Sequence, residues 1–243
     1  MNAFLAQVRG TLVPDMVAQD GPLPPLLLVL TMVTGLVDAF SYLVLGHVFV
    51  ANMTGNVIFL GFALAGARGF SIVASLVALA SFWCGALTGG AIGARMTQHR
   101  GRLLTHAMAL QSACFIVAVV VTAVSATPVT AGERYVLIVV LSVAMGIQNA
   151  TARKLAVPDL TTTVLTLTIT GTAADSSLAG GKGFSAGRRL LSVMAMFLGA
   201  LAGALLVVHS VIVIPLAAAA TAVVCIGVVA SRLGRLDAPW VTP

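Results

Sequence analysis

Long apolar stretches follow one another along almost the entire chain and leave only short loops between them. Charged residues make up 8% of the 243 residues and hydrophobic residues 59%, whereas about a quarter of a soluble domain is charged. A soluble fold could not bury this much apolar surface, so the chain is predicted to fold in a lipid bilayer, which a helix of about 20 apolar residues can cross. Eight apolar segments can be drawn, at 26–45, 48–67, 71–94, 104–126, 135–152, 159–179, 190–209 and 211–231.

Two of the eight segments differ from the others because they carry runs of polar residues. The segment 48–67 opens with Asn52, Thr54 and Asn56, and the segment 159–179 is rich in threonine. Irregular or polar backbone at membrane depth is tolerated only where protein or water surrounds it. These two segments are therefore candidates for short or broken helices that do not cross the membrane.

The positions of the basic loops favour six full spans over eight. If all eight segments cross, the basic runs at 95–102 and 153–154 lie on one side and those at 182–189 and 232–235 on the other. If the two polar segments do not cross, all four runs lie on one side, as expected of cytoplasmic loops. The prediction is an all-α transmembrane bundle of six spans plus two short polar helices, with both termini cytoplasmic in a bacterial inner membrane.

The second half of the chain repeats motifs of the first in the same order and at a nearly constant offset. The repeated blocks are 35–39 with 146–150, 51–57 with 158–164, and 85–89 with 199–203. This pattern predicts an internal duplication, and duplicated halves are a recurrent layout of transporters. With six spans the two halves are inverted relative to one another, and with eight they are parallel.

The duplication divides the chain into five parts. Residues 1–25 are predicted to be a short, weakly ordered leader. The others are the first repeat half at 26–94, a loop, helix and loop at 95–134, the second half at 135–209, and a last helix with a short cytoplasmic tail at 210–243.

Asp38 is the most informative single residue, because it lies near the middle of the first apolar segment. A charge there costs about 2.5–3.5 kcal/mol, and such residues often mark ion or proton paths. The alternative is that Asp38 braces a broken helix by accepting hydrogen bonds. Asn149 takes the equivalent place in the second half, so any ion coupling through this pair would be one-sided.

The other candidate binding residues come mainly from the two polar segments. Their donors and acceptors could hold a solute or ion at a helix end. The alternatives are that Asp159 begins a helix and that the threonines bond to carbonyls one turn earlier. The predicted substrate-binding or ion-binding set is Asp38, Asn52, Thr54, Asn56, Asn149, Asp159, Thr161, Thr162 and Thr163.

Glycines at four-residue spacing predict faces where helix backbones touch. Such faces could pack within one chain, including on each other, or between the chains of a homo-oligomer. The residues are Gly85, Gly89, Gly93, Gly199 and Gly203.

The sequence gives no positive support for catalysis, a cofactor, a metal site or nucleic-acid binding. Its three cysteines, Cys84, Cys114 and Cys225, all fall in apolar segments, and its four histidines are scattered. The net charge of +6 comes from short runs between apolar segments and not from one patch. We expect a protein that is not an enzyme.

The blocks 35–39, 50–56, 146–150 and 157–163, in this order, resemble the YoaK-like family of bacterial membrane proteins. The resemblance covers the chain from about residue 26 to 232 and implies a polytopic inner-membrane protein with about six spans. This family is largely known as a domain of unknown function, so the resemblance assigns no residue roles. The leading hypothesis is a small-solute or ion transporter with its site between the halves. The alternative is a membrane scaffold or assembly partner with a closed polar core.

Overall fold

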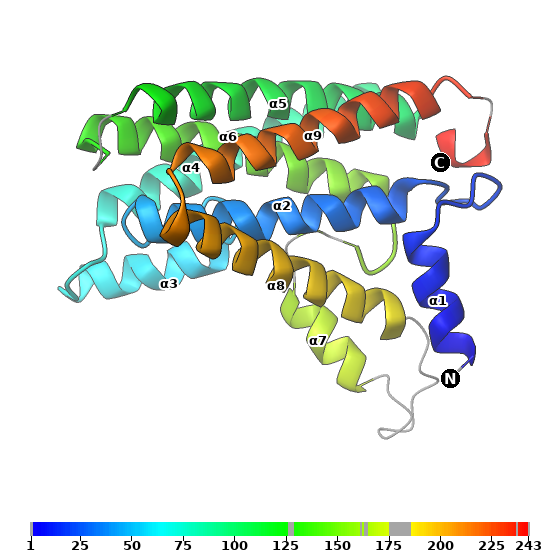
Figure 1. Cartoon of the computed structure of the whole chain (residues 1–243), viewed down its shortest axis with the longest axis horizontal. Coiled ribbons are helices and arrows are strands. Elements are labelled where there is room, and N and C mark those ends of the chain that lie inside the picture. Colours follow the sequence, from blue (N-terminus) through cyan, green and yellow to red (C-terminus); the bar gives the residue numbers. More distant parts are fainter. Residues whose placement is uncertain are drawn as a thin grey trace.

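Six long helices form a bundle in the computed structural model of the chain (Figure 1), which describes residues 2–125, 129–160, 162, 165–174, 186–236 and 238–242. Each is long and apolar enough to cross a membrane, so the predictions of an all-α fold and six candidate spans are confirmed. The six are α2 (Leu23–Val44), α4 (Ile72–Arg95), α5 (Arg100–Val124), α6 (Ala131–Leu155), α8 (Ala186–His209) and α9 (Val213–Leu233).

The two polar segments contain the short helices α3 (Met53–Leu64) and α7 (Leu165–Ala174). The 12 residues of α3 span about 18 Å, well short of the roughly 30 Å of hydrocarbon in a bilayer. The break before α3 follows from local backbone geometry, because Gly46 at the end of α2 has φ +87°, a conformation that favours glycine. The chain then returns toward α2 before α3 begins.

The bundle is built from helix pairs that come from opposite halves of the chain. α2 packs on α8 and α4 packs on α6, while α5 packs on both α6 and α9. α3 lies against α4, and α7 against α8. Figure 1 shows that the two termini lie at the same end of the bundle, here called the terminal end.

The α2–α8 crossing is so close that only glycine fits there. A Cβ atom added to Gly35 would collide with the carbonyl oxygen of Met196, and one added to Gly199 would collide with that of Met32. At Gly203 the added Cβ would lie 2.6 Å from the carbonyl oxygen of Leu36. The two backbones therefore touch over more than one turn, as small residues allow in membrane helices.

The α4–α6 crossing has the same character. Added Cβ atoms on Gly85 and Gly146 would collide with the carbonyl oxygens of Val143 and Phe82, respectively. One on Gly89 would lie 2.8 Å from the carbonyl oxygen of Ile147. The glycine faces of α4 and α8 thus pack on α6 and α2 within one chain, and not on each other.

Gly93 continues the glycine face of α4 by one further turn. A Cβ atom there would lie 2.8 Å from Cγ of Lys154, near the end of α6. This neighbour is a flexible side chain and not backbone, so the constraint on Gly93 is weaker than that on Gly85.

The leader, predicted to be weakly ordered, contains a helix in the structure. Residues Asn2–Leu12 form helix α1, and the side-chain oxygen of Gln7 accepts a hydrogen bond from the backbone N–H of Gly187 in α8 at 3.2 Å. The tail also folds back, since the short 3-10 helix Pro239–Val241 buries Trp240 fully. A Cβ on Gly21 would collide with the Trp240 ring, so the two terminal segments pack together.

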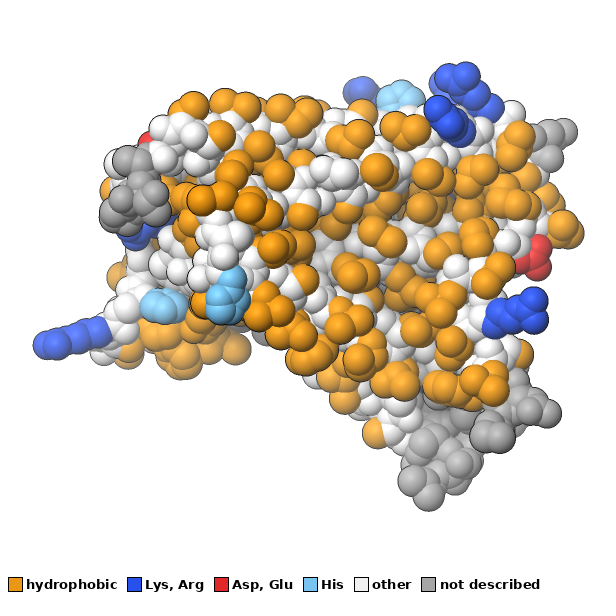
Figure 2. Space-filling model, viewed as in Figure 1, with side chains coloured by type: hydrophobic (Ala, Val, Ile, Leu, Met, Phe, Trp, Pro, Cys, Tyr) orange, Lys and Arg blue, Asp and Glu red, His pale blue; other side chains and the backbone are white. Residues whose placement is uncertain are grey.

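The surface matches a bilayer environment. Figure 2 shows hydrophobic side chains across the face of the bundle and charged side chains gathered toward its ends. Within the six long helices, each Asp, Glu, Lys and Arg lies near a helix end, except Asp38 in α2. Asp38 is 8% exposed, so the bundle, and not lipid, surrounds it.

Candidate functional site

A cavity of about 650 Å³ lies between the first half of the chain and helices α7 and α8 of the second. Its α2 residues run from the middle of that helix toward the end farther from the termini. The volume lies within the range of small-molecule binding pockets. Side chains and backbone of Thr34, Gly35, Asp38, Ala39, Tyr42, Phe49, Ala51, Asn52, Met53, Thr54, Gly55, Ile58, Phe82, Thr166, Met196 and Ala200 line it.

Asp38 lines this cavity and also holds the segment that leads into α3. Its Oδ1 accepts hydrogen bonds from the backbone N–H groups of Val50 at 3.0 Å and Ala51 at 2.8 Å. The carboxylate therefore lies at the N-terminal end of α3, where the helix dipole favours negative charge. These two hydrogen bonds and the dipole offset the cost of burying a charge. The bracing role considered from the sequence is thus present, in a residue that also faces the cavity.

Asn56 fixes the same loop from the α3 side and does not line the cavity. Its side-chain oxygen accepts from the backbone N–H of Phe49 at 2.9 Å, and its Nδ2 donates to the Phe49 carbonyl at 2.6 Å. One fully buried amide therefore satisfies both backbone groups of one residue. The Phe49 ring is held at the cavity wall in consequence.

Replacing Asn56 by alanine is expected to destabilise the protein by about 2–3 kcal/mol, because both backbone groups of Phe49 lose their partner in a buried place. Thermal unfolding of the purified protein in detergent measures this. Asn52→Ala is the matched control, since the Asn52 side chain makes no capping hydrogen bond at the start of α3. Equal unfolding temperatures for the two variants would contradict the role given to Asn56.

An aromatic cluster adjoins the cavity at the α2–α3 turn. The Tyr42 and Phe49 rings stack with centroids 5.2 Å apart and an interplanar angle of 26°. Phe59 stacks on Phe49 at 5.4 Å, and Phe70 lies 5.1 Å from Phe59. Such ring contacts are worth about 0.5–1.5 kcal/mol each beyond burial. Tyr42 and Phe49 face the cavity, and the others support them from behind.

A buried polar chain leads from the cavity into the bundle. Gln148 of α6 donates from Nε2 to the hydroxyl of Thr34 at 2.8 Å, and its Oε1 accepts from Gln111 of α5 at 2.7 Å. Both glutamines are fully buried. Three helices are thereby joined beside the cavity, and sequence reasoning missed this because it judged Gln148 only as part of a repeated motif.

Asn149, Asp159 and Thr162, the described members of the predicted set from the second half, are not among the residues that line this cavity. Asn149 donates to the carbonyl of Met145 one turn earlier at 2.9 Å. Asp159 does not begin a helix; it has φ +61° and forms an ion pair with Arg189 at 2.8 Å.

The threonine predictions in the second polar segment are only partly covered by the structure. Thr162 is buried with φ +63° and precedes α7. Thr161 and Thr163 lie outside the described residues. From this segment it is Thr166 that lines the cavity.

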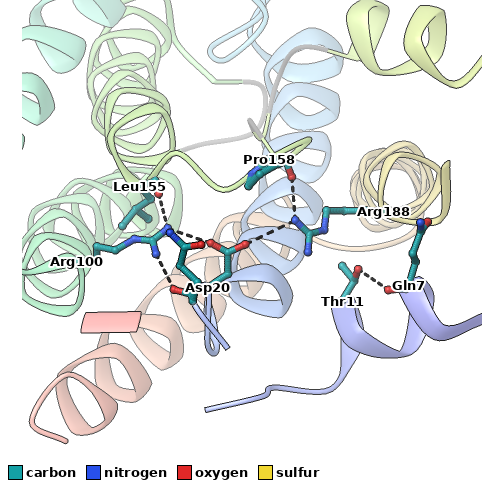
Figure 3. A network of polar contacts seen from close by, with 8 residues as sticks. Gln7, Thr11, Asp20, Arg100, Leu155, Pro158 and Arg188 are labelled. Carbon is teal, nitrogen blue, oxygen red and sulfur yellow. Dashed lines mark hydrogen bonds and ion pairs between the residues drawn. The ribbon is translucent and has the colours of Figure 1, made fainter. Parts of the chain in front are cut away.

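A network of charged contacts joins the two halves at the terminal end (Figure 3). Asp20 lies 3.3 Å from Arg100 of α5 and 3.7 Å from Arg188 of α8. Arg100 also donates to the carbonyl of Leu155 at 2.5 Å, and Arg188 to that of Pro158 at 3.3 Å. These contacts, here called the terminal latch, link the leader, α5, α6 and α8. No local sequence signal could have found them, since Asp20 and Arg100 are 80 residues apart.

Six long apolar helices, an apolar surface between charged ends and a cavity within the bundle that Asp38 lines define a multi-pass membrane protein. The chain belongs to the family described as protein of unknown function (DUF1275), whose model matches residues 26–230. A transmembrane protein of Bacillus subtilis (strain 168), UPF0700 transmembrane protein YoaK, is 36% identical over 154 residues, which is 63% of this chain and 66% of that relative. The match thus spans just under two thirds of the relative's length.

These similarities confirm the resemblance to the YoaK-like family and identify a bacterial multi-pass membrane protein. No solved structure matches the chain. The function is therefore argued from the cavity itself.

Proposed function

We propose that this protein is a transporter of a small solute or ion, which binds in the cavity between the two halves of the chain. The cavity carries the proposal, because it brings Asp38, Asn52 and Thr54 of the first half together with Thr166 of the second. Membrane transporters bind their substrates at such interfaces between halves, near short helices. We also propose that the protein is not an enzyme.

We further propose that the halves are inverted repeats, and the glycine crossings support this. In the alignment of the two repeats, Gly35 and Met196 of the α2–α8 crossing are equivalent to Gly146 and Phe82 of the α4–α6 crossing. In the same way, Gly199 and Met32 are equivalent to Gly85 and Val143. All four glycines meet the equivalent carbonyl oxygen. A two-fold axis between the halves would produce this agreement, and it would pass beside the cavity.

The distribution of charge supports a cytoplasmic terminal end. Five of the six long helices carry basic residues at the terminal end: Arg95 on α4, Arg100 on α5, Lys154 on α6, Arg188 on α8 and Arg232 on α9. Cytoplasmic loops retain such residues. With the terminal latch in place at this end, the structure is proposed to represent a state closed to the cytoplasm.

The alternative function is a scaffold or assembly partner with a closed polar core, and one observation favours it. Asn56 and Asp38 already bond to the backbone before α3, as expected if the polar residues only shape the fold. The two functions differ in whether water and solutes reach the cavity.

Thiol accessibility tests the proposal. In a variant that lacks the three native cysteines, single cysteines at Asn52, Thr54 and Thr166 would be treated with membrane-impermeant thiol reagents from each side of sealed vesicles. A transporter predicts labelling at all three positions, because all three line one water-accessible cavity. Labelling from the side opposite the terminal end would agree with the proposed orientation.

Val57→Cys is the matched control, since Val57 is 58% exposed on the α3 surface that faces away from the bundle. In lipid its thiol should react poorly. Protection of all three cavity positions, in protein that elutes as a folded species, would contradict transport through this cavity and support the scaffold alternative.

A further inference from the structure

We propose that the solute bound in this cavity is an organic monocation, held by the Asp38 carboxylate against the aromatic rings of Tyr42 and Phe49. The inference rests on the proposed function and names its substrate class. Three features of the cavity carry it, namely the sign of the charge that its wall can carry, the rings in its wall and the lack of a second carboxylate for a metal ion among its described residues.

The charge that the cavity wall can carry is negative. Among the described residues that line it, Asp38 is the acid, and no Lys, Arg or His is present. The hydrogen bonds from Val50 and Ala51 both end on one oxygen of Asp38, Oδ1, and a carboxylate with its two oxygens has acceptor capacity left for a donor within the cavity. An anionic solute would meet uncompensated repulsion here, whereas a cation completes the pair.

Two aromatic residues, Tyr42 and Phe49, line the cavity together with Asp38. Tyr42 follows Asp38 by four residues on α2, so the two side chains share one helix face. Phe49 stacks on Tyr42 and stands one residue before Val50, whose N–H binds Asp38. A cation within about 6 Å of such ring faces is attracted by their quadrupole, and quaternary ammonium groups are bound in this way.

The rings are positioned before any ligand arrives. Phe49 is fixed by the Asn56 amide on its backbone and by Phe59 on its ring. A ring held in its binding position loses little side-chain freedom when the ligand binds, which favours affinity.

A bare inorganic cation fits the cavity less well. Calcium ions take about six to eight oxygen ligands, several of them from carboxylates, and Asp38 is the one carboxylate among the described residues of the wall. The Thr34 hydroxyl already accepts from Gln148 and donates to the carbonyl of Leu30 at 3.0 Å. Much of the remaining wall is apolar, including Ala39, Ile58 and Met196. Such a wall suits the methyl and methylene groups of an organic cation.

Equilibrium binding to the purified full-length protein in detergent tests this inference. The probes are radiolabelled choline, tetramethylammonium and methylguanidinium, each with 3,3-dimethylbutan-1-ol as competitor, a neutral molecule with the shape of choline. We expect saturable binding of at least one cation and no competition by the neutral alcohol. Asp38→Asn should weaken binding on the order of tenfold or more.

The Asp38→Asn variant separates charge from folding, because an asparagine oxygen still accepts from Val50 and Ala51. A second variant, Phe49→Leu, should weaken binding severalfold by removing one ring. Phe62→Leu is its control, since Phe62 belongs to the same aromatic cluster but does not line the cavity. Equal affinities in Phe49→Leu and Phe62→Leu would overturn the role of the cavity rings.

The remaining outcomes distinguish this inference from the proposed function. Competition by the neutral alcohol at equal affinity, or unchanged binding in Asp38→Asn, would overturn the monocation and leave solute binding standing. Failure of all three cations to bind, with the thiol labelling of the cavity still positive, would do the same. Failure of the labelling itself would overturn the transporter and the monocation together.

Discussion

Leucine in place of Gly85 is expected to prevent stable assembly of the bundle. A first side-chain atom at this position already collides with the carbonyl oxygen of Val143, and backbone cannot move aside as a flexible side chain can. α4 and α6 would have to separate, and the crossing that joins the two halves would be lost. We expect the free energy of unfolding to fall by at least about 3 kcal/mol, which is at the upper end of the effects seen when a core is overpacked.

Gly90→Leu is the matched control, because nothing lies within 4 Å of a Cβ placed there and leucine favours a helix by up to about 1 kcal/mol over glycine. Size-exclusion profiles and thermal unfolding in detergent measure both variants. A folded, monodisperse Gly85→Leu protein with an unchanged unfolding temperature would show that α4 and α6 do not touch as described.

Loss of Arg100 is expected to have the second largest effect. The side chain is 8% exposed and donates to the Gln19 carbonyl, to Asp20 and to the Leu155 carbonyl. In Arg100→Gln these groups lose their shared partner, and Asp20 keeps only the longer contact to Arg188. Removing one partner of a buried pair costs about 3–5 kcal/mol.

Arg102→Gln serves as the control, since Arg102 is exposed and two residues further along the same helix. Limited proteolysis adds a local readout, because release of the leader should make residues near Asp20 accessible to protease in Arg100→Gln alone. Indistinguishable unfolding temperatures and cleavage patterns for the two variants would contradict the terminal latch.

The spans were predictable because their signal is continuous along the chain. For α2, the apolar run was predicted at 26–45, and the observed helix is Leu23–Val44. The difference arises because Pro24 and Pro25 fit a first helical turn, where their missing N–H groups cost nothing. The shortness of α3 was also indicated, since Asn52 and Thr54 make poor contacts with lipid.

Contacts between distant segments were not predictable in the same way. Asp38, Asn52 and Thr54 were found from their chemistry, and they share the cavity. Tyr42 and Phe49 were missed, because an aromatic residue in an apolar segment has no distinctive pattern until its neighbours are known. For Asp159 the sequence offered a binding role or a helix start, whereas in the structure it pairs with Arg189, 30 residues away.

The α2–α8 crossing has a consequence for biosynthesis. Gly35 leaves the ribosome early, but Gly199, which belongs to the same crossing, follows only after a further two thirds or so of the 243-residue chain has been made. At about 5–20 residues per second this delay is on the order of 10 s. During that time α2 resides in the bilayer without its partner, with Asp38 lacking the shelter of α8. Until α8 has been made, the glycine face of α2 has no backbone from that helix to pack against, so this crossing can form only late in synthesis.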